Sequence, residues 1–163
     1  MDLILQGIAQ ALHLLWSLDR EVLAITLLSL EVSGAATAIS VVIGISLGTA
    51  IALAPFWGKQ LVVSVVNTGM GLPPVVVGLF VSILLWRSGP LGFLGILYTP
   101  AAIVIAQSII ATPIVMGITI GAMQNLPPNL RLQILALGAT RWQMVWWLVK
   151  EARLPLMAGV MAG

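Results

Sequence analysis

Residues that could carry out catalysis are few in this sequence. His13 is the single histidine, there is no cysteine, and the five acidic residues form neither a catalytic carboxylate pair nor a metal-binding cluster. A Ser-His-Asp set and the phosphate-binding pattern G-x-x-x-x-G-K-[ST] are also missing. We therefore expect that the chain is no enzyme, binds no cofactor or metal, and leaves any ATP hydrolysis to another protein.

Proline, glycine and neutral polar residues gather between residues 67 and 78, in a chain that is 60% hydrophobic. Proline removes a backbone donor and clashes with the preceding helical turn, so the stretch is predicted to break its helix. Backbone groups freed at membrane depth are tolerated only against protein or beside water. The break is therefore either a structural kink or a pore lining. In the second case the path residues are Asn67, Thr68, Gly69, Gly71, Pro73, Pro74 and Gly78.

Residues 124–153 form the longest polar interruption and hold five of the twelve charged residues. Leu130, Ile134 and Leu137 recur at helical spacing. Gly138 follows where a helix end needs a left-handed residue. This spacing predicts a short helix that ends in a hinge.

A second helix is predicted directly after this hinge. Thr140 and Gln143 match the S/T-x-x-E/Q capping box that starts a helix. Pro155 is expected to end or kink this helix. Four residues at i, i+3, i+4 and i+7 predict its apolar face, which we expect against the bilayer: Trp142, Val145, Trp146 and Val149.

The same stretch resembles the cytoplasmic coupling loop of permease subunits of bacterial ABC importers, whose pattern is E-A-A-x-x-x-G followed by I-x-L-P. Residues 137–143 resemble the glycine half and residues 153–156 the proline half. The E-A-A positions hold residues 132–134 instead, and glycine and proline lie one helical turn further apart than usual. The resemblance implies that the ATPase contacts Leu132, Gln133, Ile134, Leu135, Leu137, Gly138, Ala139, Thr140 and Arg141.

The resemblance also implies partners and a cargo. Two copies of the chain would assemble with a cytoplasmic ATPase dimer, which holds ATP and magnesium, and with an extracytoplasmic substrate-binding protein. The layout looks most like tungstate-type permeases, with molybdate and sulfate relatives next, and this favours the pore lining over the kink. The alternatives are a permease for another small solute, a secondary transporter or channel, or a membrane scaffold.

Composition independently indicates an all-α integral membrane protein. Only 7% of residues are charged, against about 25% in soluble proteins, and a spanning helix needs about 20 apolar residues. The net charge of +2 gives no reason to expect nucleic acid as a partner. The predicted spans have no charged residue in their central parts, so we expect the driving force for transport to come from outside the bilayer.

We predict a single permease domain over residues 1–163, with 124–153 as its coupling loop. It consists of an interfacial helix over 3–18, spans within 22–54, 61–86 and 100–122, and the start of a fourth span after Pro155. We expect the chain to be truncated relative to the family, since eight residues cannot span a bilayer.

Small residues repeat every fourth position in the first span, from Ala36 to Ala52, and a second G-x-x-x-G lies in the third span. Such stripes let helices approach closely in a membrane. The predicted packing residues are Ser40, Gly44, Gly48, Gly117 and Gly121.

The cations predict orientation in a bacterial or archaeal cytoplasmic membrane. Five of them flank one side of the spans, and only Arg20 and Arg87 flank the other. Under the positive-inside rule the larger group is cytoplasmic, which places the N-terminus and residues 87–99 outside.

This orientation can be tested by labelling, because the chain has no cysteine of its own. In intact cells an impermeant thiol reagent should label a Ser88→Cys variant and leave a Gln60→Cys variant unlabelled. The reverse labelling pattern would contradict the predicted topology.

Overall fold

The computed structural model describes residues 4, 6–7, 16 and 19–162, and every regular element in this part is a helix. The prediction of an all-α protein is confirmed. The interfacial helix expected over residues 3–18, with His13, lies almost wholly outside the described residues. The elements are α2 (Arg20–Leu53), α3 (Lys59–Met70), α4 (Pro74–Leu85), η1 (Gly92–Leu94), α5 (Pro100–Gln124), α6 (Leu130–Ala136), α7 (Arg141–Glu151) and α8 (Arg153–Ala162).

Helix α2 runs without interruption through the region predicted as the first span. Its N-terminus is capped by Asp19, whose carboxylate accepts hydrogen bonds from the backbone N–H groups of Glu21 at 2.9 Å and Val22 at 3.4 Å. It ends at Leu53 because Ala54, which precedes a proline, adopts an extended backbone conformation.

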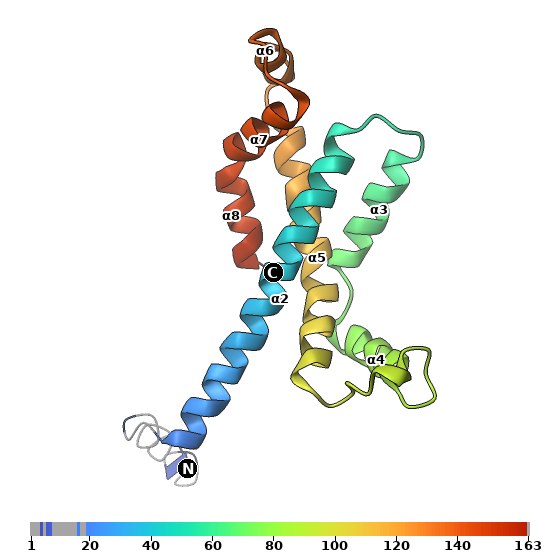
Figure 1. The fold of residues 1–163 in the computed structure, drawn as a ribbon, viewed down its shortest axis with the longest axis vertical. Helices are drawn as coiled ribbons and strands as arrows, with labels where there is room; N and C mark the ends of the chain where they lie inside the picture. The colour runs from blue at the N-terminus through green and yellow to red at the C-terminus, as the bar shows by residue number, and fades with distance from the viewer. Residues whose placement is uncertain (1–3, 5, 8–15, 17–18, 163) are drawn as a thin grey trace.

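Helices α2 and α5 lie side by side, run in the same direction and form the centre of the fold (Figure 1). A Cβ added at Gly44 would lie 2.7 Å from Cβ of Val115, and one at Gly48 would lie 2.8 Å from Cβ of Thr119. Ser40, on the same stripe, is fully buried. The small residues of α2 therefore allow the two backbones to approach more closely than larger side chains would permit.

Helix α3 packs on another part of α5. A Cβ at Gly69 would lie 3.0 Å from Cβ of Pro113, and a Cβ at Gly117 would lie 2.5 Å from the sulfur of Met70. The space beside Gly121 is open, because no atom lies within 4 Å of the position of a Cβ there. Of the G-x-x-x-G pair in α5, only Gly117 therefore lies at a close helix contact.

The second predicted span is not one continuous helix. Helices α3 and α4 are separated by residues 71–73 and bent by 100°. Pro73 and Pro74 lack the N–H groups that would continue α3, and Pro74 instead occupies the first position of α4. By length and composition two described helices can cross a membrane, or three spans result if the bent pair counts as one.

Helices α7 and α8 follow each other with only Ala152 between them. Pro155 does not end α7, as the sequence suggested, because α7 already ends at Glu151. Pro155 lies in the first turn of α8, where its missing N–H would have no helical partner. Helix α8 occupies the segment predicted as the start of a fourth span.

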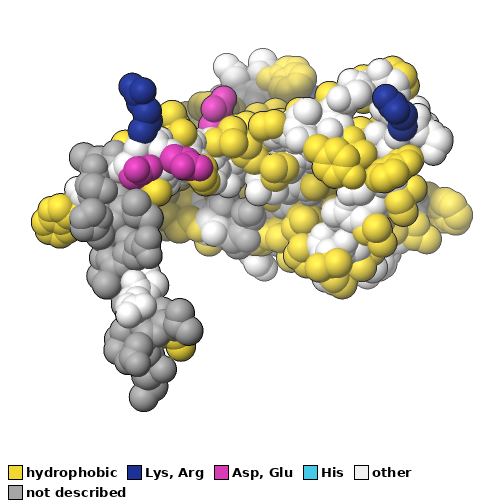
Figure 2. Space-filling view, turned by 90° about the horizontal axis from the view of Figure 1, so that it is seen from below, with side chains coloured by type: hydrophobic (Ala, Val, Ile, Leu, Met, Phe, Trp, Pro, Cys, Tyr) yellow, Lys and Arg dark blue, Asp and Glu magenta, His cyan; other side chains and the backbone are white. Residues whose placement is uncertain are grey.

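The helices define two ends of the bundle. The α2–α3 connection and helices α6 and α7 lie at one end, and α4 and the start of α2 lie at the other (Figure 1). Seen from this second end, hydrophobic side chains cover much of the surface (Figure 2). Many large apolar side chains of α2, α4 and α5 are exposed, which is the surface expected of a protein in lipid.

Close packing of α2 on α5 gives a test of the fold. Gly44→Val should lower the free energy of unfolding by about 1–3 kcal/mol, because the new side chain overlaps Val115. Gly34→Val is the matched control, since Gly34 lies in the same helix with no atom within 4 Å of a Cβ. The measurement is the thermal midpoint of the protein in detergent, and equal midpoints for the two variants would contradict the described packing.

Candidate functional site

The first candidate region is the segment that contains α6 and α7. Helix α6 ends in a Schellman motif: the N–H of Gly138 bonds to the carbonyl of Leu135 at 3.0 Å, and that of Ala139 to the carbonyl of Ile134 at 3.4 Å. Gly138 has φ +85°, the left-handed conformation that favours glycine. The predicted helix end and hinge are therefore confirmed.

The N-cap residue of α7, Thr140, lies two residues after Gly138 and forms a complete capping box. The Thr140 hydroxyl accepts a hydrogen bond from the N–H of Gln143 at 3.3 Å, and the Thr140 N–H donates to Oε1 of Gln143 at 2.8 Å. This confirms the predicted start. Because both helix ends have their own hydrogen bonds, residues 137–140 form a defined turn between α6 and α7.

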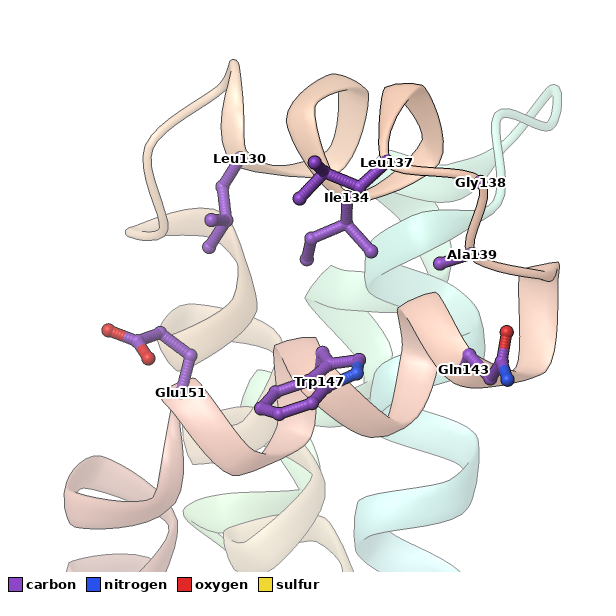
Figure 3. A pocket seen from close by; sticks show the side chains of 8 residues that line it. All are labelled: Leu130, Ile134, Leu137, Gly138, Ala139, Gln143, Trp147 and Glu151. Atoms are coloured by element: carbon purple, nitrogen blue, oxygen red, sulfur yellow. The ribbon is translucent and has the colours of Figure 1, made fainter.

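A groove of about 600 Å³ lies between α6 and α7. Figure 3 shows Leu130 and Ile134 of α6 pointing toward Trp147 of α7 across this groove, with Gln143 and Glu151 near its two ends. The remaining lining residues are Leu137, Gly138 and Ala139. An apolar groove with polar ends has the chemistry to receive an apolar side chain of a partner protein.

The side of α7 that packs on the bundle is not the predicted tryptophan stripe. Met144 and Leu148 are buried at 4% and 2% exposure, whereas Trp142 and Trp146 are 86% and 69% exposed. The buried pair joins residues of α5 and α8 in one apolar cluster, whose buried members are Ala122, Met123, Met144, Leu148, Ala152 and Leu156. An apolar stripe alone does not tell a face that packs on protein from one that faces lipid. That the tryptophans lie against the bilayer stays a prediction.

The residues predicted for ATPase coupling fall into two groups. Ile134, Leu137, Gly138 and Ala139 line the groove. The others do not line it, and they are all exposed: Leu132, Gln133, Leu135, Thr140 and Arg141. Sequence reasoning missed Trp147 as a groove residue. Its position four residues after Gln143, on one side of the same helix, is the signal that could have found it.

The second candidate region is the break between α3 and α4. Asn67, Thr68 and the residues from Gly71 to Pro74 are exposed on the surface of the single chain. Gly69 instead contacts Pro113 of α5, and no atom lies within 4 Å of a Cβ at Gly78. The Thr68 hydroxyl donates to the carbonyl of Ser64 at 2.9 Å, which ties it to its own helix.

A small cavity of about 190 Å³ between α2 and α5 contains neutral polar groups that sequence reasoning did not assign to the path. Ser33 and Thr37, four residues apart on α2, line it together with Gln107 of α5. The i, i+4 spacing of two hydroxyl residues in an apolar helix was the available signal. These hydroxyl and amide groups can donate hydrogen bonds to an anion without adding charge to the spans.

Comparison with known protein families gives one match that covers most of the chain. Residues 40–162 match the family described as "Binding-protein-dependent transport system inner membrane component". The match includes the break between α3 and α4, helix α5 and the whole α6–α7 segment.

Individual relatives are also permease proteins of transport systems. The chain is 41% identical to a "Probable anion ABC transporter permease protein" of Haloferax volcanii over 85% of its own length and 60% of that protein's length. It is 37% identical to the tungstate uptake system permease protein TupB of Peptoclostridium acidaminophilum, over 98% of its own length and 70% of the relative's. It is 27% identical to the molybdenum transport system permease protein ModB of Haemophilus influenzae, over 83% of its own length and 61% of the relative's. The chain thus spans between 60% and 70% of the length of these relatives.

Proposed function

We infer the function from a premise that these matches establish: the chain belongs to the binding-protein-dependent transport system inner membrane components, the permease subunits of ABC transporters. We propose that it is the permease of an ATP-driven importer that moves a tetrahedral oxyanion into the cell. Tungstate is the favoured cargo, and molybdate, sulfate or another small solute is the alternative. The single observation that carries the proposal is similarity to a tungstate permease over 98% of the chain.

Two copies of the chain would form the membrane part of this importer. A cytoplasmic ATPase dimer would supply energy and hold ATP and magnesium, and an extracytoplasmic binding protein would deliver the anion. In this arrangement the α6–α7 end faces the cytoplasm, and the N-terminus and residues 87–99 lie outside. Five cations support this orientation, Lys59 at the start of α3 and the four cations within residues 124–153.

Energy coupling is assigned to the α6–α7 groove. Helices that bind a partner do so through apolar residues spaced three or four positions apart. Leu130 and Ile134 are such a pair, and they form the α6 wall of the groove. Trp147 forms the opposite wall, so an inserted ATPase side chain would contact both helices at once. The turn at Gly138 sets the angle between α6 and α7 and therefore the shape of the groove.

Passage of the anion is assigned to the break between α3 and α4. Its exposed residues carry neutral donors, and the described parts of α3 and α4 contain no acidic side chain that would repel an anion. The break has exposed, non-helical backbone, which at membrane depth needs water or another protein surface beside it. A central path between two copies would satisfy this requirement.

Coupling is tested with a Gly138→Val, Ala139→Asp double variant in the complex reconstituted with ATPase and binding protein. Valine is strained at φ +85° by about 1–2 kcal/mol, and the carboxylate places a charge in the apolar groove. ATP-driven tungstate uptake should fall, and so should the ATP hydrolysis that tungstate stimulates. The binding protein should still dock on the opposite face of the complex.

The matched control is Gly58→Val, which strains a second left-handed glycine, φ +86°, at the same end of the bundle and outside the groove. It should retain most of the stimulated ATPase activity. Unchanged uptake and ATPase association in the double variant would contradict the coupling assignment.

Thr68→Asp tests the assigned path. Two like charges 4 Å apart repel by about 4 kcal/mol at an effective dielectric constant of 20, so the new carboxylate should reduce oxyanion uptake at least roughly tenfold. Thr68→Asn is similar in size and neutral, and it should transport normally. Loss of the Asp variant from the membrane would support a structural kink. Normal uptake by it would leave Ser33, Thr37 and Gln107 as the polar groups to examine.

A further inference from the structure

The C-terminal end of α2 is a point where three separate segments of the chain meet. The last carbonyls of a helix have no partner within the helix and carry partial negative charge. Helix α2 has no basic residue in its own last turn. Two cations from other segments of the chain donate hydrogen bonds to its last carbonyl groups instead.

The first cation is Lys59, whose Nζ donates to the carbonyl oxygen of Ala52 at 2.7 Å. The second is Arg131, whose Nη1 donates to the carbonyl oxygen of Leu53 at 3.2 Å. Lys59 is the first residue of α3, whereas Arg131 lies in the first turn of α6, 78 residues after its acceptor in sequence. Neighbouring carbonyls of one helix end are thus bound by side chains of two other helices.

Helix α6 has little packing of its own. It is seven residues long and contains no buried residue. Leu130 and Ile134 are partly buried and pack against the apolar cluster of α5, α7 and α8, as do Ala52 and Leu53 of α2. The Arg131 bond is the one direct side-chain hydrogen bond between α6 and a membrane helix among the described residues.

We propose that Arg131 is a positioning residue for transport: it ties the coupling helix α6 to the end of α2, and Lys59 holds the adjacent carbonyl in place. A displacement of α6 by the ATPase then reaches α2 directly as well as through the covalent connection to α5. Since α2 packs on α5 along its small residues, the movement is transferred to the centre of the bundle. This assignment of a mechanical role rests on the proposed function.

The contact itself is tested by hydrogen exchange of the reconstituted complex. Arg131→Gln should speed amide exchange in residues 130–136 by roughly threefold to tenfold, the effect of losing a charged donor that is partly screened by water. Exchange in α7, which has its own capping box, should not change. Arg131→Lys keeps a cationic donor and should restore most of the protection. Arg153→Gln, at the exposed start of α8, is the matched charge control and should leave α6 exchange as in the wild type.

The mechanical role is tested by the number of ATP molecules hydrolysed per tungstate ion imported. Arg131→Gln should raise this ratio with little change in basal ATPase activity, and Arg131→Lys should bring it back. An unchanged ratio, or unchanged exchange in α6, would overturn the proposal. If the wild-type complex imports no oxyanion, the proposed function fails, and the exchange contrast between Arg131→Gln and Arg153→Gln then decides by itself whether the Arg131 contact positions α6.

Discussion

The close contact between α2 and α5 is the constraint on which the rest of the structure depends. In lipid there is no hydrophobic gain from bringing two apolar helices together, so association depends on tight van der Waals packing and on buried polar contacts. Gly44 and Gly48 provide the first, because α5 occupies the space in which their side chains would lie. Ser40 contributes a buried hydroxyl that lies 3.4 Å from the carbonyl oxygen of Ser108 on α5 and 2.8 Å from that of Ala36 in its own helix. The other helices are placed relative to this pair: α3 and α8 pack on α5, and α6 and α7 continue from its end.

How much could be predicted from sequence depends on whether the signal was local. The hinge at Gly138 and the start of α7 at Thr140 were predicted correctly, because a left-handed glycine and a capping box are determined by a few adjacent residues. The small-residue stripe of α2 was likewise visible as a strict four-residue repeat. Which face of α7 packs on the bundle was not predicted: Met144 and Leu148 pack inward, while Trp142 and Trp146 of the predicted apolar stripe are exposed. In a membrane protein an apolar face can meet lipid or protein, and only the position of the neighbouring helices decides which. For the same reason the proline break was foreseen but its 100° bend was not.

The end of the molecule that carries α6 and α7 combines a rigid attachment with an open surface. Helix α7 is fixed to the bundle by Met144 and Leu148, and its tryptophans remain exposed. Helix α6 contributes no buried residue and leaves one wall of the groove accessible. A partner docking there would therefore meet one wall that is firmly held and one that can move. A binding surface with one fixed wall and one movable wall can transmit a displacement of the partner to the membrane helices as well as bind the partner.

Because α2 and α5 run in the same direction, the segment between them has to cross back through the membrane. A chain that crosses twice in the same direction has to return once, so residues 54–99 must cover the whole thickness of the layer. Helix α3 has 12 residues and covers about 18 Å at 1.5 Å per residue, against a hydrocarbon core of about 30 Å. Helix α4 is turned by 100° and adds almost nothing along this direction. The outer part of the return, about 12 Å by this difference, is thus covered by residues 71–73 and by α4, which lies across this direction. The non-helical backbone of residues 71–73 needs water or another protein surface beside it at this level.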